Sequence, residues 1–281
     1  MSQPVSLIKN SLQKACYATI MLADPKEKCE QVKLLHDTFL YGELAIDHQT
    51  AEPISAPGRP EKPELVLPKL LKKRGIGSQH GRNHLMHAVA HIEFNAINLA
   101  LDAVYRFADQ PEQYYADWLS VAAEEAIHFK LVCNYLSSNN VHYGDYPAHD
   151  GLWDMCIRTS NNVLARMALV PRVLEARGLD VTPTLIEKLT NAGDLAAADV
   201  LKIIYKDEID HVRIGSDWFV FHCQQQNKEP QETFLHCVEN YLHGELRGPF
   251  NLTARQKAGF TATELAYLNK HYANKPSKTL N

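Results

Sequence analysis

The sequence predicts an all-α protein in which four long helices form an antiparallel bundle, with further helices before and after it. Apolar residues recur every three to four positions over most of the 281-residue chain, which is the period of a helix with one buried face. Strand-like alternation and the paired turn residues of hairpins are absent. Two segments with one polar pattern, EEAIHF and DEIDHV, interrupt otherwise apolar helical faces.

The N-terminal region is expected to form two helices. The first covers residues 4–22. Asp24 and Pro25 supply an N-cap and a first-turn proline for the second helix, which ends near Tyr41.

An extended segment follows over residues 45–70, which are rich in proline and poor in periodicity. It is either a domain linker or a strap packed along the domain. The strap is preferred because Leu65, Val66 and Leu67 require burial.

The bundle is expected over residues 79–226. Its long helices cover residues 79–108, 111–137, 152–177 and 194–226, with a short helix over residues 183–192. Gly178 offers a left-handed cap, so the third long helix should end there. The short helix should then continue in roughly the same direction after a local break. One or two more helices are expected in the tail from Pro230.

We therefore expect one domain with four parts: N-terminal helices, strap, metal-binding bundle and C-terminal extension. Their bounds are residues 1–44, 45–78, 79–226 and 227–281.

The two polar segments place Glu125 with His128, and Glu208 with His211, three residues apart on the apolar face of a helix. A buried carboxylate is costly unless its charge is compensated. A single buried Glu–His pair is more often a structural hydrogen bond. Two such pairs indicate that a cation supplies the compensation.

Each pair is preceded by one more acid on an apolar face. Glu93 precedes Glu125 by 32 residues, and Glu175 precedes Glu208 by 33. The chain thus contains two copies of a helix pair that contributes Glu and then Glu-x-x-His. Four carboxylates and two imidazoles in this order are the known ligand set of the di-iron and di-manganese helical bundles.

The chain also resembles a known family. The segments AHIEFNAINLALD, EEAIHF, PRVLEARGLDVTP, DEIDHVRIG and GPFNLTARQKAGF are similar to a bacterial family of ferritin-like proteins of unknown function, over nearly the whole length. More distantly, the arrangement is similar to tRNA-hydroxylating monooxygenases and rubrerythrins. The resemblance implies a ferritin-like bundle, a dinuclear metal centre and no particular substrate. The ligands it implies are Glu93, Glu125, His128, Glu175, Glu208 and His211.

Three further positions are candidates around this centre. Glu124 and Asp207 precede the motif glutamates, and each is expected to hydrogen-bond the histidine of the other motif, Asp207 to His128 and Glu124 to His211. Solvated helix surface is the alternative for both. Tyr205, one turn before Glu208, is either a core residue or a catalytic hydrogen-bond partner.

Histidines 84, 87 and 91 lie on another face of the first bundle helix and are interpreted as a polar flank or an outer cluster.

Oxygen-rich ligation favours two iron ions, or manganese, over zinc. The leading hypothesis is an oxygen- or peroxide-activating oxidoreductase with a small-molecule substrate or an electron-donor protein as partner. The alternatives are a non-enzymatic metal-binding protein for storage, delivery or sensing, and a tRNA-modifying hydroxylase. The sequence does not decide whether the protein forms a homodimer.

Composition narrows these hypotheses. The net charge of −4 and the pI near 6.4 disfavour nucleic-acid binding. The six cysteines form no CxxC pair, so an electron-transfer iron held by such pairs is not expected. A signal peptide and a membrane-spanning run are not expected either, which favours the cytoplasm.

Overall fold

The computed structural model describes residues 11–48, 50–71, 74–242 and 246–272. The protein is all-α: these residues contain no β-strand, only isolated bridges between Ser11 and Ala45 and between Leu65 and Ala148. The chain divides into two compact units, Met1–Ser160 and Asn161–Asn281. This boundary separates Glu93, Glu125 and His128 from Glu175, Glu208 and His211. The single domain expected from the sequence stays a prediction.

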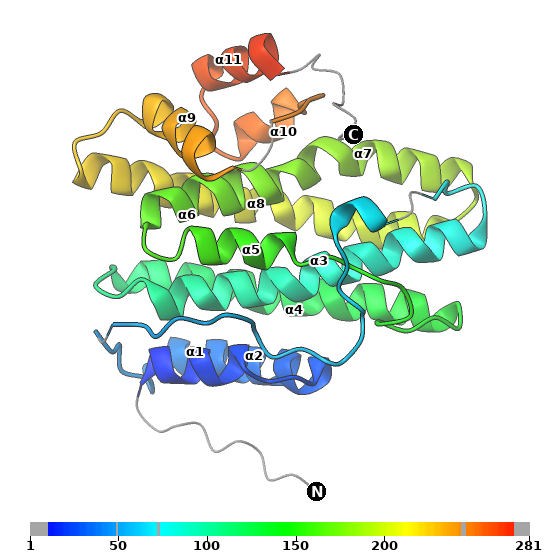
Figure 1. Ribbon diagram of the computed structural model, residues 1–281, viewed down its shortest axis with the longest axis horizontal. Coiled ribbons are helices and arrows are strands. Elements are labelled where there is room, and N and C mark those ends of the chain that lie inside the picture. Colours follow the sequence, from blue (N-terminus) through cyan, green and yellow to red (C-terminus); the bar gives the residue numbers. More distant parts are fainter. Residues whose placement is uncertain (1–10, 49, 72–73, 243–245, 273–281) are drawn as a thin grey trace, which may run out of the picture. The chain divides into compact units, whose positions relative to one another are not determined.

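The first unit is built around one helical hairpin. Its elements are α1 (Leu12–Ile20), α2 (Pro25–Leu40), the short 3₁₀ helix η1 (Pro68–Leu70), α3 (Gln79–Arg106), α4 (Glu112–Ser138) and α5 (Gly151–Arg158). α3 and α4 lie side by side, α1 packs against α3, and α2 packs against α4 (Figure 1). Residues 4–10 of the expected first helix lie outside the described residues.

Local signals explain where these helices begin. Asp24 accepts a hydrogen bond from the Glu27 amide at 2.8 Å, and Pro25 occupies the first helical turn, as predicted. Ser78 caps α3 in the same way through the amide of Gly81, at 3.1 Å. Each cap satisfies a backbone N–H that the helix itself leaves without a partner.

The extended segment packs along the first unit, so the strap interpretation is confirmed. The Gly58 amide donates to Ile20 O at 2.9 Å, and the Val66 amide donates to Ala148 O at 2.9 Å. Arg59 Nη1 donates to Asp150 Oδ2 at 2.9 Å. The expected burial is only partly correct: Leu65 and Val66 are half-buried, whereas Leu67 is 59% exposed.

The second unit also contains a helical hairpin. Its elements are α6 (Val163–Leu169), the π-helical turn η2 (Val170–Glu175), α7 (Ala176–Asn191), α8 (Leu195–Gln225), α9 (Pro230–Tyr241), α10 (Leu252–Lys257) and α11 (Ala262–Tyr272). α7 lies beside α8, which also contacts α6 and η2 (Figure 1). α9 packs on α6, and α10 packs on α7 and α8. The tail therefore carries three helices where one or two were predicted.

The continuous helix predicted over residues 152–177 is wrong. The chain leaves the helix after Arg158, and Asn162 caps a new one by accepting from the Ala165 amide at 3.1 Å. The turn then widens to a π-helix that contains Pro171. Proline lacks an N–H and crowds the carbonyl one turn earlier, so a regular α-turn is unfavourable there.

The predicted helix end at Gly178 is also wrong. Gly178 lies inside α7, which continues through Pro183 to Asn191 without the expected break. The positive backbone angle of a left-handed cap occurs instead at Gly193, where φ is 77°.

Within the described part of the chain, no helix has the length and apolarity needed to cross a membrane.

Candidate metal centre

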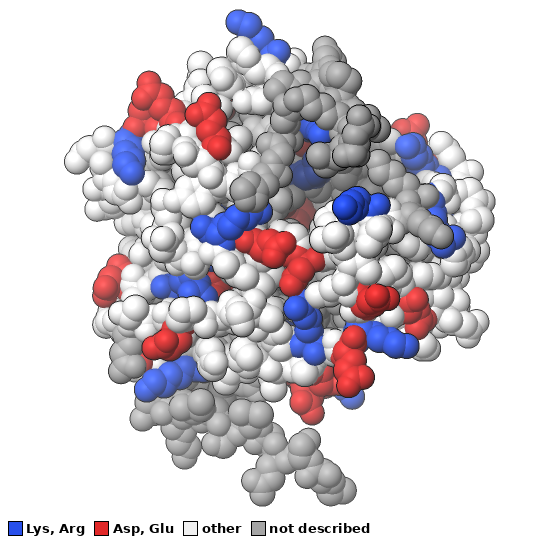
Figure 2. Space-filling view, in the orientation of Figure 1, with Lys and Arg blue, Asp and Glu red and all other residues white. Residues whose placement is uncertain are grey.

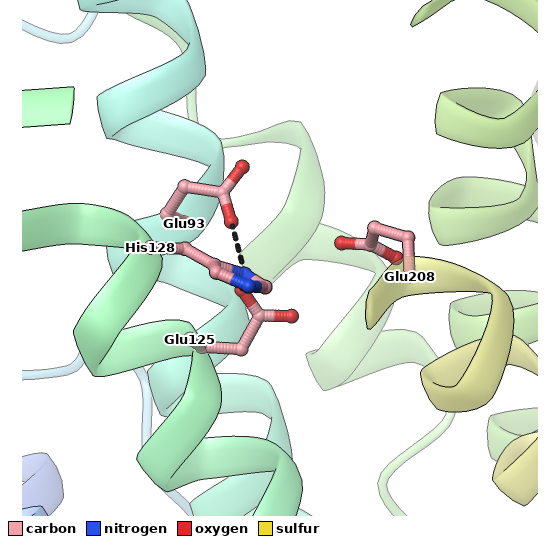
Figure 3. A group of neighbouring side chains, drawn as sticks. All are labelled: Glu93, Glu125, His128 and Glu208. Carbon is pink, nitrogen blue, oxygen red and sulfur yellow. Dashed lines mark hydrogen bonds and ion pairs between the residues drawn. The ribbon is translucent and has the colours of Figure 1, made fainter. Parts of the chain in front are cut away.

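Three of the predicted ligands meet inside the first unit. Glu93 projects from α3, and Glu125 and His128 project from α4 toward it (Figure 3). All three are buried, with 3%, 0% and 1% of their surfaces exposed. His128 Nδ1 lies 3.3 Å from Glu125 Oε2 and 3.4 Å from Glu93 Oε2. One ligand atom from each residue lies within 4.8 Å of the others.

The hairpin explains this meeting. Glu125 and His128 share one helical face because they are three residues apart. Glu93 faces them because α3 and α4 are packed side by side. Figure 3 also labels Glu208, which α8 of the second unit carries.

Burial controls the protonation of this cluster. Burial and the adjacent Glu125 carboxylate raise the pKa of Glu93 from 4.5 to about 8. Burial alone lowers the pKa of His128, but hydrogen bonds and charge from Glu125 and Glu93 outweigh it and raise that pKa to about 11. In the absence of a metal, protons therefore compensate the two carboxylates.

These residues fit a cation. Carboxylate oxygens and an imidazole nitrogen are suitable ligands for iron or manganese. A cation between the two facing carboxylates can neutralise the negative charge that protons otherwise neutralise. A divalent ion would take the place of these protons, so binding would release them. The donor set lacks thiolate and holds more oxygen than nitrogen, which favours iron or manganese over structural zinc.

The second unit carries the matching residues on its own hairpin. Glu208 and His211 lie one turn apart on α8, with Glu208 half-buried and His211 buried. Glu175 is half-buried and ends the π-helical turn that packs on α8. Their part in metal binding stays a prediction.

A close packing contact supports the π-helical turn. A Cβ atom added at Gly215 of α8 would lie 2.2 Å from Cβ and Cγ of Pro171. Glycine at position 215 therefore allows α8 to approach the turn that leads to Glu175.

The predicted carboxylates of the outer shell are both half-buried. Asp207 Oδ1 lies 3.7 Å from Lys206 Nζ, and the Asp207 side chain is 30% exposed. The predicted bonds from Asp207 to His128 and from Glu124 to His211 stay predictions.

Tyr205 has a partner that the sequence did not indicate. The side-chain Nδ2 of Asn251 donates to Tyr205 Oη at 3.0 Å, and the backbone N–H of Asn251 donates to Asp180 Oδ1 at 2.9 Å. Asn251 belongs to the GPFNLTARQKAGF segment, 46 residues after Tyr205. A role for this segment could be suspected from its family resemblance, but its contact with Tyr205 could not.

The three flanking histidines contact tyrosines of the loop that follows α4. His84 and His87 lie against Tyr146, with ring centres 5.0 and 5.3 Å apart. His91 Nδ1 lies 2.9 Å from Tyr143 Oη. They form a polar and aromatic flank of α3.

Residues 21–266 match a family described as "Protein of unknown function (DUF455)". An uncharacterized protein of Haemophilus influenzae is 42% identical over 257 residues, which cover 88% of this chain and 89% of that protein. No solved structure matches the chain significantly. Both matches span the two helical hairpins and name no activity.

Proposed function

The chain belongs to the DUF455 family, whose function is unknown, and we propose that it is a dinuclear metal carboxylate protein that activates oxygen or peroxide as an oxidoreductase. Iron is the proposed metal, with manganese as the alternative. The observation that carries this proposal is the buried group of Glu93, Glu125 and His128, whose donor atoms converge between two packed helices.

The proposed centre has six ligands, three from each hairpin. Support for the second set comes from the repeat, since the order Glu, then Glu-x-x-His, recurs at nearly equal spacing. Support also comes from the packing of the elements that carry these residues, α3 against α4 and the π-helical turn against α8. The ligands are Glu93, Glu125, His128, Glu175, Glu208 and His211.

When bound, reduced iron would supply electrons for the reduction of oxygen or peroxide. The protein's own residues hold the cations and keep water away from them. Phe94 and Phe129 are buried, follow two of the ligands in sequence, and have ring centres 5.4 Å apart. Close-packed rings of this kind exclude water from the interface of α3 and α4, the two helices that carry these ligands.

The electron donor and the substrate are proposed to be separate molecules, because the sequence contains no CxxC pair for a second iron site. A tRNA substrate is the weaker alternative. On the face drawn in Figure 2, acidic and basic side chains of the described residues are interspersed and form no broad basic surface.

Metal analysis tests the ligand set. Protein reconstituted with ferrous iron should hold about two ions per chain, because paired ions share these ligands. Glu125→Ala and Glu175→Ala should each lower occupancy while helix content stays nearly unchanged, since removal of a buried charge need not destabilise the metal-free protein.

Glu187→Ala is the matched control, because Glu187 is an exposed acid on α7. It should leave occupancy unchanged. Absence of bound iron and manganese in the unsubstituted protein would contradict the proposal. Full occupancy in Glu175→Ala would restrict the ligands to the remaining residues.

A second experiment separates an enzyme from a storage protein. Protein loaded anaerobically with two ferrous ions per chain is exposed to oxygen, and oxygen consumption and iron uptake are followed. Rapid consumption that stops at two oxidised ions per chain supports an oxidoreductase. Continued uptake of iron well beyond two ions per chain supports storage instead.

A further inference from the structure

We propose that a pocket in the first unit binds a small organic carboxylate whose body is apolar. The pocket has a volume of about 350 Å³ and lies between the start of α2, the strap, α4 and the loop after α4. Its walls include Pro25, Pro60, Phe129 and Tyr143. This volume is at the lower end of the range for small-molecule sites, so a single ring with its substituent is a suitable size.

The walls are held in place before any ligand binds. The strap next to Pro60 is fixed where the Gly58 amide donates to Ile20 O at 2.9 Å and Lys28 Nζ donates to Gly58 O at 2.8 Å. A side chain at position 58 would clash, since an added Cβ would lie 2.1 Å from Met21 O. The strap can therefore lie this close to α1 only because residue 58 is glycine.

The opposite wall is equally fixed. Tyr143 Oη is hydrogen-bonded to His91 Nδ1 at 2.9 Å, and its ring meets Phe129 edge-on with centres 5.1 Å apart. A preformed pocket costs a ligand little reorganisation, which favours specific binding of a small molecule.

Part of the lining is apolar. Cys29 and Cys133 belong to it, and burial raises the pKa of their thiols to about 11 and about 12. Both are therefore neutral at pH 7 and act as small apolar groups. With the rings of Phe129 and Tyr143, they form a surface that suits an apolar body and penalises a charged one.

Two exposed lysines, Lys26 and Lys130, also line the pocket. Asp24 is the acid that lines it, and its carboxylate is already engaged as the cap of α2. The local charge is therefore positive although the whole chain is negative. A carboxylate can pair with an ammonium group of the lining while its apolar part enters the pocket.

Benzoate is a suitable probe, with benzyl alcohol as its uncharged counterpart and inorganic phosphate as an anion without an apolar body. Titration calorimetry should show saturable binding of benzoate, weaker binding of benzyl alcohol and none of phosphate. Benzoate should also slow the alkylation of Cys133, which is the half-exposed thiol of the pocket.

Variants locate the binding. Lys130→Ala should weaken benzoate binding by about two- to fivefold, as expected for loss of an exposed ion pair, and should not affect benzyl alcohol. Cys133→Phe should abolish binding of both by filling the pocket. Lys202→Ala is the control, since Lys202 is an exposed lysine of the second unit paired with Asp199.

Circular dichroism establishes that each variant is folded. If Cys133→Phe does not fold, Lys130→Ala and the protection of Cys133 still decide the matter. Equal affinity for benzoate and benzyl alcohol, equal affinity for phosphate, or an unchanged affinity in Lys130→Ala would each overturn the proposal. Because the probes are tested for binding alone, these outcomes do not depend on the proposed metal centre.

Discussion

Arg172 and Glu264, 92 residues apart, form a buried ion pair in which Arg172 Nη2 donates to Glu264 Oε1 at 2.6 Å. Arg172 lies in the π-helical turn, and Glu264 lies in α11. The guanidinium also lies 4.5 to 4.9 Å from the ring centres of Phe219, Phe234 and Phe260. The C-terminal extension is thus attached to the turn that ends at Glu175.

Glu264→Gln should destabilise the second unit by roughly 3 kcal/mol, because it leaves the buried Arg172 without its counter-charge. Urea unfolding followed by circular dichroism measures this change, and hydrogen exchange should show faster opening at residues 170–175. Glu239→Gln, at an exposed acid of α9, should change stability by less than about 0.5 kcal/mol. Similar stability in both variants would show that the ion pair does not hold the turn.

Two glycines in the second unit should respond to alanine in opposite ways. Gly215→Ala should destabilise by about 1–3 kcal/mol, since its Cβ would overlap Pro171. Gly178→Ala should stabilise by about 0.5–1 kcal/mol, because Gly178 lies inside α7 and an added Cβ meets nothing within 4 Å. Thermal unfolding of both variants measures the difference. A loss of stability in Gly178→Ala would mean that α7 ends near residue 178.

Lys28 should make stability depend on pH. Its ammonium is buried and bonded to Ile20 O, Gly58 O and Asn98 Oδ1. Burial lowers its pKa from 10.5 to about 7. Between pH 7 and 10.5 the unfolded chain holds a proton that the folded protein has lost, so stability rises with pH in this window.

Lys28→Met cannot titrate and supplies the comparison. From pH 7 to 9.5, the free energy of unfolding of the natural protein should rise relative to that of the variant by up to about 1.4 kcal/mol per pH unit. Urea titrations at several pH values measure this difference, in which the other groups largely cancel. A difference that does not change with pH would show that Lys28 keeps its ordinary pKa.

Asp207→Asn should weaken metal affinity roughly 10- to 100-fold if Asp207 orients His128, as predicted from the sequence. Competition with a metal chelator measures the affinity. Asp210→Asn is the control, because Asp210 is 65% exposed on the same helix and paired with Arg213. Equal metal affinities in the two variants would show that Asp207 does not orient His128 and is an ordinary surface acid of the helix.

The bounds of the regular helices could be predicted from the sequence because they depend on residues close together in the chain. Periodicity and capping residues located α2, α3, α4 and α8 to within a few residues. Helical spacing also placed Glu125 and His128 on one face, because residues three apart coincide on any α-helix.

The irregular elements were not predictable in this way. Pro171 reads in sequence as one unfavourable residue within a helical pattern, yet the chain accommodates it as a π-helical turn packed against Gly215. Gly178 reads as a cap, yet α7 continues because α8 packs along it. In both cases tertiary packing outweighed local preference, which amounts to about 1 kcal/mol for a glycine.

The sequence by itself therefore determined the helical class and the residue types of the candidate metal centre, since both follow from short-range spacing along the chain. Only the tertiary structure decided that Glu93 lies 3.4 Å from His128, that Arg172 pairs with Glu264, and that a pocket lies beside Tyr143. Such contacts join residues far apart in sequence, and their distances depend on how whole helices pack, which no local pattern encodes.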